Sequence, residues 1–558
     1  MTSKFLQRNQ THVLNGDTTK VREEKAKETS SSSTKKKMSP QSKVMTVFLG
    51  LLAAQFVSAT SNTIISNAMP VIVAQIGGNA VQYTWVITAG ILANTIVTPV
   101  AGKLADLFDK KKLFIFSLVL FATASLLSGA AQSASQLIAS RVLQGLGMGM
   151  MVTLTTVIMA TIVSPRERGK FNGYMAASFA IATVAGPLLG GLIVDTLGWR
   201  WCFWVTVPFV IAVMFVVARQ LQVPTVHEGK ASIDYLGIAL IGAASASLLI
   251  WISSEGRDFK IDAPVSIALV VLFVVSTVLF VVVESRVSEP LIPLHLFRNR
   301  TVMLSILSFL GQGVAMFSIS VFAGQYFQYG RGYTPTEAGL LTLPLVIPMM
   351  AASTIIGRRT TATGYWKRYV VSGLTSMVVG LALLVPITGQ TNLWYMGAAM
   401  SLVGFGMGAA GTLMVAVQNL VGLSIMGVTT STVMFFRTLA GAIGIQLLGR
   451  VYQTHVRDDI VSKLGEFPSS SGGAGELDLA ALPDPVEAVV RGAYGQELGA
   501  VFVWMTVIVA VGLVAVCFIK GTSLRSSVDL ERVQEIFEQE GDVLEPPRHQ
   551  GEPDHDKE

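Results

Sequence analysis

The sequence predicts an all-α membrane protein with fourteen transmembrane helices, arranged as two six-helix pseudo-repeats with two extra helices between them. Three observations predict this fold: membrane-length apolar runs, a low fraction of charged residues and an internal repeat. The runs fill the chain from about Val44 to Ile519. A bilayer core needs roughly 20 apolar residues per helix, and in lipid the backbone polar groups of such a run must be paired within it.

Composition agrees with a membrane protein. Hydrophobic residues make up 51% of the chain and charged residues 14%, against roughly 25% charged in soluble domains. The formal charge of +6 does not indicate a nucleic-acid partner, because the basic residues lie in loops on one side of the spans. Cys202 and Cys517 fall on opposite faces in this topology, so we expect no disulfide and no metal site.

The elements follow in order along the chain. A polar segment, residues 1–43, cannot bury apolar surface and is predicted to be a disordered cytoplasmic tail. The fourteen spans are predicted to begin near residues 45, 83, 112, 137, 172, 201, 233, 263, 301, 336, 369, 393, 427 and 498. The predicted domains are a six-helix bundle at 44–220, two linker helices with their loops at 221–300, a second bundle at 301–520 with an external loop at 455–497, and an acidic cytoplasmic tail at 521–558.

Orientation follows from lysine and arginine in the short loops. One set of loops is rich in them, as in Lys103 and the run Lys110–Lys112, whereas the opposite short loops hold only Arg200, Arg257, Lys260 and Arg331. Basic loops stay in the cytoplasm. Both termini are therefore predicted to be cytoplasmic, in a multi-pass protein of the cell (plasma) membrane.

The chain repeats itself. Gly145–Gly149 recurs as Gly404–Gly408. At nearly the same offset, Gly102-Lys103 recurs as Gly357-Arg358, and Ala185-Gly186 recurs as Ala440-Gly441. Duplicated halves around a central site are the architecture of secondary transporters, which rock one half against the other.

The end of the second span carries Gly102, Asp106 and Lys112. Gly102 allows a close helix approach. Asp106 can sit near a helix N-terminus and a cation, as a latch that holds in one conformational state and breaks in the other. The alternative is an ordinary cytoplasmic loop.

Several motifs resemble one known family. Gly102–Lys112 resembles the G-x-L-a-D-r-x-G-r-k-x loop of the major facilitator superfamily, with Asp109 where that pattern has glycine. The fourth-span and fifth-span motifs of the family are matched by Ser140–Gly147 and by Gly186–Gly191, the latter reading G-P-x-x-G-G. With Pro290–Arg300, Tyr326–Gln328 and Ala416–Asn419, the chain is similar to the 14-span drug:proton antiporter branch.

The resemblance implies a secondary efflux transporter, not an enzyme, that exchanges small amphiphilic drugs or toxic compounds for protons in a lipid bilayer. No phosphate-binding loop or cofactor motif is found, so an ion gradient is the expected energy source and no cofactor is expected. The alternatives are a dedicated exporter or importer of one metabolite or lipid-like molecule, or a non-transporting scaffold or sensor on a transporter fold. The sequence carries no signal for the oligomeric state.

The resemblance and the chemistry of embedded groups select candidate conformational residues. Arg141 is costly inside a membrane; it either pairs with Asp195 as a gate or proton relay, forms a static bridge, or snorkels outward. Pro187 is predicted to kink its helix, and the motif glycines to allow close packing. The full set is Gly102, Asp106, Lys112, Arg141, Gly186, Pro187, Gly190, Gly191 and Asp195.

Polar residues within spans are the substrate-binding candidates, although such residues also bond across helices. They are Asn62, Asn67, Gln144, Gln312, Gln325 and Arg437. Flexible methionines, among them Met148, Met150, Met151, Met316, Met349 and Met350, are candidates for a promiscuous lining. Ser61 stands where the branch often has an embedded acid, so we expect neutral or anionic amphiphiles rather than dications.

Overall fold

A computed structural model of the protein describes residues 40–76, 80–163, 165–221, 234–254, 263–287, 289–422, 425–465, 483–521 and 523–524. The chain divides into two compact units, Met1–Thr46 and Val47–Glu558. Of the first unit, the described residues 40–46 begin a helix. The expected tails therefore lie outside the described residues, except for residues 40–43 and 521, 523 and 524. The described residues are nearly all helical, with no strand among them.

Helices of the first half begin and end at recognisable caps. Asp109 caps the helix that starts at Lys110 by accepting hydrogen bonds from the backbone N–H groups of Lys111 and Lys112, and Ser133 caps the next helix. The helices are α2 (Pro40–Gln75), α3 (Ala80–Leu107), α4 (Lys110–Ala130), α5 (Ala134–Ile162), α6 (Pro165–Leu197), α7 (Trp201–Trp204), α8 (Thr206–Gln220), α9 (Tyr235–Ser254) and α10 (Pro264–Glu284).

The second half follows a short 3₁₀ turn. Asn299 caps its first long helix, Thr334 and Glu337 form a capping box, and Gly364 ends α13 with a φ of 73°. The elements are η1 (Leu294–Arg298), α11 (Arg300–Gln325), η2 (Tyr326–Gly330), α12 (Pro335–Leu341), α13 (Leu343–Thr363), α14 (Lys367–Leu383), α15 (Leu393–Ala410), α16 (Thr412–Gln418), α17 (Met426–Leu464), α18 (Asp484–Gln496) and α19 (Leu498–Cys517).

Twelve helical segments among the described residues are long and apolar enough to cross a membrane. Helices α6 and α14 occupy the places of the expected fifth and eleventh spans and are not among the twelve. Helix α14 has 17 residues, fewer than the roughly 20 that a perpendicular span needs. The count of fourteen spans is therefore not confirmed.

The repeated glycines make equivalent contacts in the two halves. A Cβ on Gly145 would lie 2.3 Å from the carbonyl oxygen of Gly90, and a Cβ on Gly404 would lie 1.9 Å from that of Leu345. Helix α5 thus packs tightly on α3, and α15 on α13. The largest buried apolar cluster is drawn from residues 296–524, and two others from residues 47–221.

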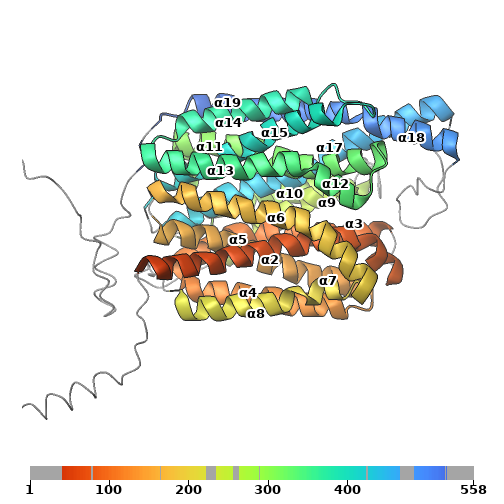
Figure 1. The fold of residues 1–558 in the computed structure, drawn as a ribbon. Coiled ribbons are helices and arrows are strands. Elements are labelled where there is room, and N and C mark those ends of the chain that lie inside the picture. The colour runs from red at the N-terminus through yellow and green to blue at the C-terminus, as the bar shows by residue number, and fades with distance from the viewer. Residues whose placement is uncertain are drawn as a thin grey trace, which may run out of the picture. The chain divides into compact units, whose positions relative to one another are not determined.

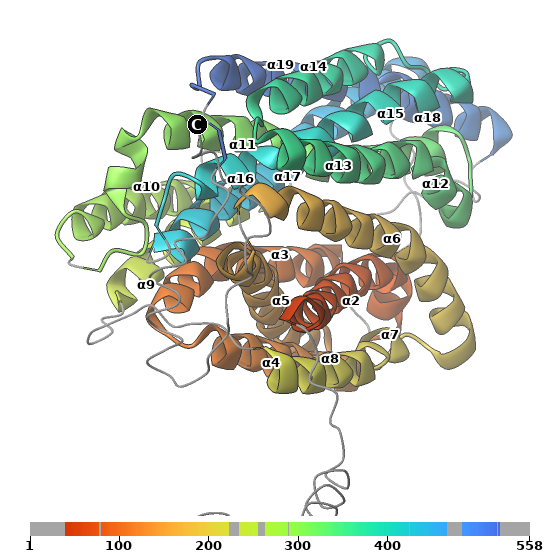
Figure 2. The same ribbon diagram turned by 60° about the vertical axis from the view of Figure 1, so that its left-hand side comes forward.

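Two helix pairs make the most extensive contacts between the halves. Helix α6 runs beside α13, as Figure 1 shows, and α3 packs against α17 (Figure 2). Helices α9 and α10 pack on each other, and α9 also contacts α3 and α17. Helix α9 therefore lies against the α3–α17 pair, and α10 packs on α9.

The external loop expected at 455–497 differs from the structure. Helix α17 continues to Leu464, and α18 covers Asp484–Gln496; residues 466–482 lie outside the described residues. Val456 and Ile460 continue the buried face of α17, and Val490 and Ala493 are the buried face of α18. Polar outer faces lower the mean hydropathy of these segments, so a search for membrane-length apolar runs does not detect them.

Candidate functional site

Asp106, near the end of α3, caps helix α17 from the other half of the chain. Its Oδ1 accepts a hydrogen bond from the backbone N of Gly427 at 2.8 Å, and its Oδ2 accepts one from the backbone N of Val428 at 2.7 Å. First-turn N–H groups have no partner within their own helix and carry the positive end of the helix dipole. A charge-assisted contact therefore joins the two halves at the basic end of the bundle, which we define as the helix ends around Lys103 and Lys110.

This contact depends on two glycines. A Cβ on Gly102 would lie 1.9 Å from Ser431 Oγ and 2.6 Å from the Gly427 carbonyl oxygen. A Cβ on Gly427 would lie 2.4 Å from the Gly102 carbonyl oxygen and 2.4 Å from Asp106 Oδ1. Backbone therefore meets backbone at the crossing, and neither position has space for a larger residue.

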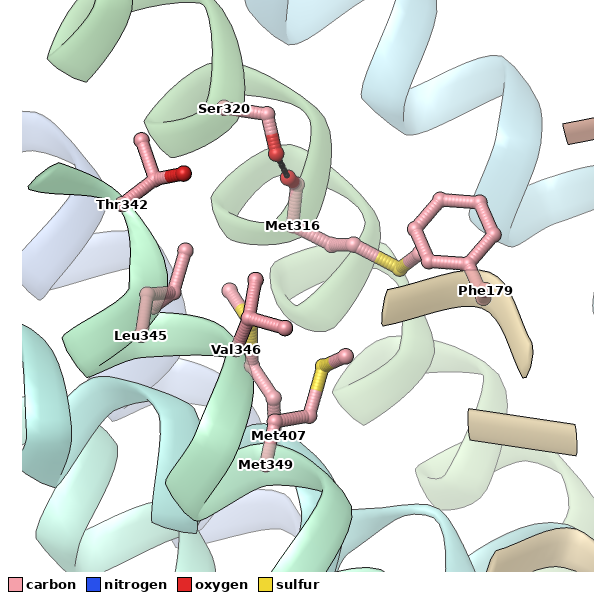
Figure 3. Close-up of a pocket in the computed structure, with 8 residues that line it drawn as sticks. All are labelled: Phe179, Met316, Ser320, Thr342, Leu345, Val346, Met349 and Met407. Atoms are coloured by element: carbon pink, nitrogen blue, oxygen red, sulfur yellow. Dashed lines mark hydrogen bonds between the residues drawn. The ribbon is translucent and has the colours of Figure 1, made fainter. Parts of the chain in front are cut away.

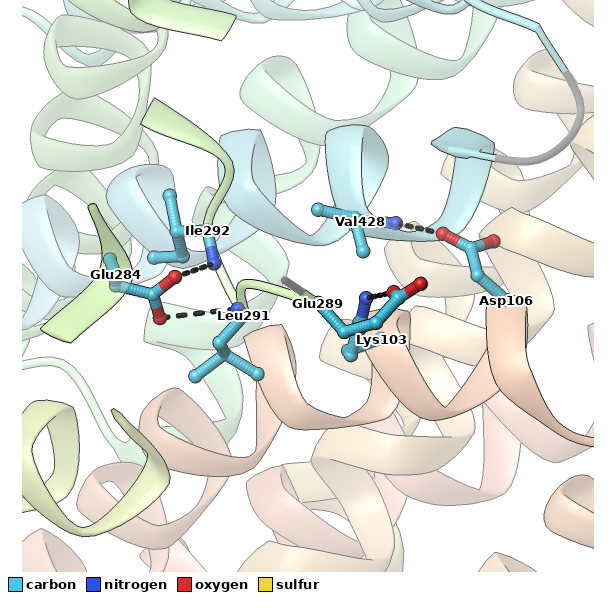
Figure 4. Close-up of polar contacts among 7 residues, drawn as sticks. All are labelled: Lys103, Asp106, Glu284, Glu289, Leu291, Ile292 and Val428. Atoms are coloured by element: carbon cyan, nitrogen blue, oxygen red, sulfur yellow. Dashed lines mark hydrogen bonds and ion pairs between the residues drawn. The ribbon is translucent and has the colours of Figure 1, made fainter. Parts of the chain in front are cut away.

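A second carboxylate network holds the segment after α10 against α3 (Figure 4). Lys103, itself 8% exposed, forms an ion pair with Glu289 of this segment. Glu284, at the end of α10 and 3% exposed, accepts hydrogen bonds from the backbone N of Leu291 at 3.1 Å and of Ile292 at 3.4 Å. The connection between the linker helices and the second half is thus fastened beside the Asp106 cap.

We expect these two glutamates to contribute unequally. The side chain of Glu289 is 38% exposed, so Glu289→Gln should cost at most about 1 kcal/mol. Glu284→Gln leaves one of two buried backbone N–H groups without its acceptor and should cost about 1–3 kcal/mol. Tryptic cleavage at Arg286, which is exposed, reports release of the segment: it should accelerate for Glu284→Gln and hardly change for Glu289→Gln. Equal rates would contradict this ranking.

Arg168 makes a second link at the basic end. Its guanidinium donates to the carbonyl oxygens of Val163 at 2.9 Å and of Ala160, and to Gln418 Oε1 at 3.5 Å. Gln418 in turn donates to Thr430 Oγ1 at 3.1 Å. The start of α6 is therefore tied through α16 to α17.

Arg141 lies in a neutral polar cluster at 3% exposure. Nη1 donates to Gln144 Oε1 at 2.5 Å, Nε to the Val86 carbonyl oxygen at 3.3 Å, and Nη2 to Asn62 Oδ1 at 3.4 Å. The predicted partner, Asp195, has its side chain outside the described set. Among the described side chains, Arg141 is bonded to oxygens of α2, α3 and α5, and none of them is a carboxylate.

The fifth-span motif separates into crowded and open glycines. A Cβ on Gly186 would lie 1.9 Å from Thr63 Oγ1, and one on Gly190 would lie 3.1 Å from the Ile64 carbonyl oxygen, whereas one on Gly191 would meet no described residue within 4 Å. Thr63 Oγ1 also bonds the Ala182 carbonyl oxygen at 3.2 Å. The crowded glycines are therefore the ones that seat α6 on α2.

We expect Gly186→Ala to destabilise the protein by about 1–3 kcal/mol through overpacking. Gly191→Ala should leave stability unchanged or raise it by up to about 1 kcal/mol, because alanine is favoured over glycine inside a helix. Thermal unfolding of the two purified variants in one detergent gives the comparison. A destabilised Gly191→Ala variant would assign Gly191 a role that its surroundings do not explain.

A small cavity of about 50 Å³ lies between α6 and the second half. Figure 3 shows the Met316 sulfur directed toward the ring of Phe179. The other lining side chains come from the region of α11–α13 and from α15: Ser320, Thr342, Leu345, Val346, Met349 and Met407. The lining is mostly apolar and rich in flexible thioethers.

Arg437, on α17, reaches this lining. Its Nη2 contacts Met316 Sδ at 2.8 Å, and its Nε has no hydrogen-bond partner among the described residues. The side chain is partly buried. Close packing of α17 on α11 sets its position, because a Cβ on Gly313 would lie 2.1 Å from the Arg437 carbonyl oxygen.

The other predicted residues do not form one site. Asn62 and Gln144 belong to the Arg141 cluster; Gln312 donates to Ser308 Oγ at 3.2 Å, and Gln325 ends α11 with its Oε1 unpaired among the described residues. The side chains of Asn67 and Pro187 lie outside the described set, and Lys112 is exposed. Met316 and Met349 line the cavity, whereas Met148, Met150 and Met151 are packed in the core.

Sequence reasoning missed Phe179, Gly427, Val428, Glu284 and Glu289. Phe179 carries no signal that separates a cavity wall from ordinary packing. The two backbone donors of α17 would have required knowledge of the contact across the halves. Only the carboxyl groups of Glu284 and Glu289, near the predicted inner end of the eighth span, offered a chemical signal.

A sequence profile described as the Major Facilitator Superfamily matches residues 51–445. The chain therefore belongs to the Major Facilitator Superfamily, a family of membrane transporters, as its motifs predicted. The human organic anion transporter MFSD10 has a similar fold, with a TM-score of 0.53 and 16% sequence identity over 85% of this chain and all of that one.

Sequence relatives support the multidrug efflux branch. The chain is 31% identical to the multidrug transporter protein MdtP of Bacillus subtilis, over 91% of this chain and 98% of that protein. It is also 31% identical to multidrug resistance protein 3 of the same bacterium, over 81% of this chain and 87% of that protein. The efflux pump dotC of Dothistroma septosporum is 30% identical over 88% and 87% of the two chains.

Proposed function

We propose that the protein exports amphiphilic small molecules from the cell in exchange for protons, by alternating access across the plasma membrane. The observation that carries this proposal is the Asp106 carboxylate capping α17. It is a compact, charge-assisted contact between helices of opposite halves, and such a contact can form in one state and break in the other. The efflux relatives support the direction of transport.

Orientation follows from the basic end. Lysines and arginines concentrate in cytoplasmic loops, so we place this end, with Lys103, Lys110 and Arg168, in the cytoplasm, together with both termini. The described conformation is then closed toward the cytoplasm. A cavity of about 50 Å³ is smaller than the roughly 300 Å³ or more that a drug-sized ligand needs, so loading requires the halves to separate.

Proton coupling needs a carboxylate that responds to the state of the bundle. Asp106 meets this need, because protonation weakens its acceptance of the two α17 hydrogen bonds and so favours opening at this end. Asp195 is the second candidate from the sequence.

Transport in proteoliposomes with an imposed pH gradient tests the proposal. Amphiphilic dyes of positive, neutral and negative charge should include at least one whose movement is driven by the gradient and abolished by an uncoupler. Dye movement that does not depend on the gradient would exclude proton coupling. If no dye moves, a scaffold or a dedicated metabolite carrier is favoured. Drug susceptibility of a deletion strain separates broad efflux from a single metabolite.

A further inference from the structure

Arg437 is an embedded cation without an adequate partner among the described residues. A guanidinium presents five N–H donors and no acceptor, yet the hydrogen bond described for this one goes to the sulfur of Met316, a weak acceptor, and its Nε has none among the described residues. Leaving such a group unpaired inside a membrane protein is costly. Since the described residues offer it no oxygen acceptor, this charge is suited to a partner that arrives from outside the chain.

The other buried arginines show what a satisfied guanidinium looks like in this bundle. Arg141 donates to oxygens of Val86, Gln144 and Asn62. Arg168 likewise donates to oxygen acceptors, through all three of its nitrogens. Arg437 differs from both, because the described acceptor beside it is a thioether.

The described carboxylates near the spans are engaged or lie at helix ends. Asp106 caps α17, Glu284 holds the segment after α10, and Glu337 belongs to the capping box of α12. None of the described ion pairs includes Arg437. A ligand that carries its own anion would neutralise this charge, whereas a cationic ligand would add a second unpaired charge of the same sign.

The wall beside Arg437 suits the apolar part of such a ligand. Met316 touches the guanidinium with its sulfur and also lines the cavity with Phe179, Met349 and Met407. Thioether side chains repack around apolar bodies of different shape, and the ring of Phe179 offers a flat surface (Figure 3). Charge and apolar wall therefore adjoin at one place.

We propose that Arg437 and this methionine-lined cavity form a binding site for amphiphilic organic anions, with a carboxylate, sulfonate or phosphate on the guanidinium and the apolar body against Phe179, Met316 and Met349. The inference rests on the proposed function and narrows its substrate class. It assigns selectivity for charge to Arg437 and breadth of apolar shape to the methionines.

Three probes that share one dansyl body test it: dansylglycine is an anion, dansylamide is neutral, and dansylaminoethyl-trimethylammonium is a cation. Binding is followed by dansyl fluorescence, with the full-length protein in nanodiscs of zwitterionic lipid. Dansylglycine should bind about tenfold or more tighter than the cation, the equivalent of one charge-assisted hydrogen bond. Arg437→Gln should weaken dansylglycine about tenfold and leave dansylamide unchanged.

Arg457→Gln is the matched control, because Arg457 lies on the same helix with an exposed side chain; it should bind all three probes like the unmodified protein. Equal or tighter binding of the cation by the unmodified protein overturns the inference. This comparison requires no folded variant, and its failure would not contradict the export of amphiphiles. Displacement of dansylglycine by added phosphatidylglycerol, itself an amphiphilic anion with a phosphate, supports the anion site and identifies a membrane lipid as its occupant. Loss of gradient-driven transport of all dyes would instead remove the proposed function.

Discussion

Replacing Asp106 by alanine is expected to lower gradient-driven transport about tenfold or more, because the closed basic end loses the cap of α17. Loss of a cap costs about 1–2 kcal/mol, and the charge at the helix dipole adds to it in a partly buried setting. This free-energy change shifts the equilibrium between the two states of the carrier and does not unfold either half. Hydrogen exchange at the amides of Gly427 and Val428 should accelerate in parallel.

Asp109→Asn is the control for this prediction. Asp109 Oδ1 accepts hydrogen bonds from the backbone N of Lys111 at 2.8 Å and of Lys112 at 3.3 Å, so it caps α4 within its own loop. Asparagine caps helices about as well as aspartate, so transport should stay within about twofold of the unmodified protein, a few tenths of a kcal/mol. Unchanged transport and exchange in Asp106→Ala would show that the cap does not hold the closed state.

The sequence predicted the fold class well and the contacts across the halves poorly, for a physical reason. Apolar runs and duplicated glycines are local patterns, and each is fixed by the bilayer or by a neighbouring helix. The partners of Asp106 are 321 and 322 residues away, and they are backbone groups that carry no residue-specific signal. Asp106 and Gly102 could be recognised in the sequence, but their contact with helix α17 could not.

Arg141 illustrates the second limit. Depth along a helix can be read from sequence, and it correctly marked a buried cation. The rotation of that helix cannot be read in the same way, so Asp195 was predicted as a partner on depth alone. Among the described residues, the long side chain reaches oxygens on α2, α3 and α5 and packs closely on Gly90, where a Cβ would lie 3.1 Å from Nη2. The Asp195 side chain lies outside the described residues, so its pairing with Arg141 stays a prediction.

These contacts predict that Arg141 and Arg437 fail in opposite ways when changed to glutamine. Arg141→Gln leaves the Val86 carbonyl oxygen and Gln144 Oε1 without their donor in a buried cluster, which should cost about 2–4 kcal/mol. Lysine should not rescue it, because a single ammonium lacks the fork that serves acceptors on separate helices. Arg437→Gln gives up a thioether contact and should cost little stability.

Thermal unfolding of the two variants in one detergent makes the comparison direct. The apparent melting temperature of Arg141→Gln should fall by about 2–4 °C, while that of Arg437→Gln should stay near the unmodified value. The effect of Arg437→Gln should appear in anion binding. A stable Arg141→Gln variant with impaired transport would instead return Arg141 to the gate or relay role that an Asp195 partner implies. The two arginines thus differ in what accepts their hydrogen bonds. Arg141 is held by oxygens of the protein and stabilises the helix packing. Arg437 has no oxygen acceptor among the described residues, so its guanidinium is available to a ligand.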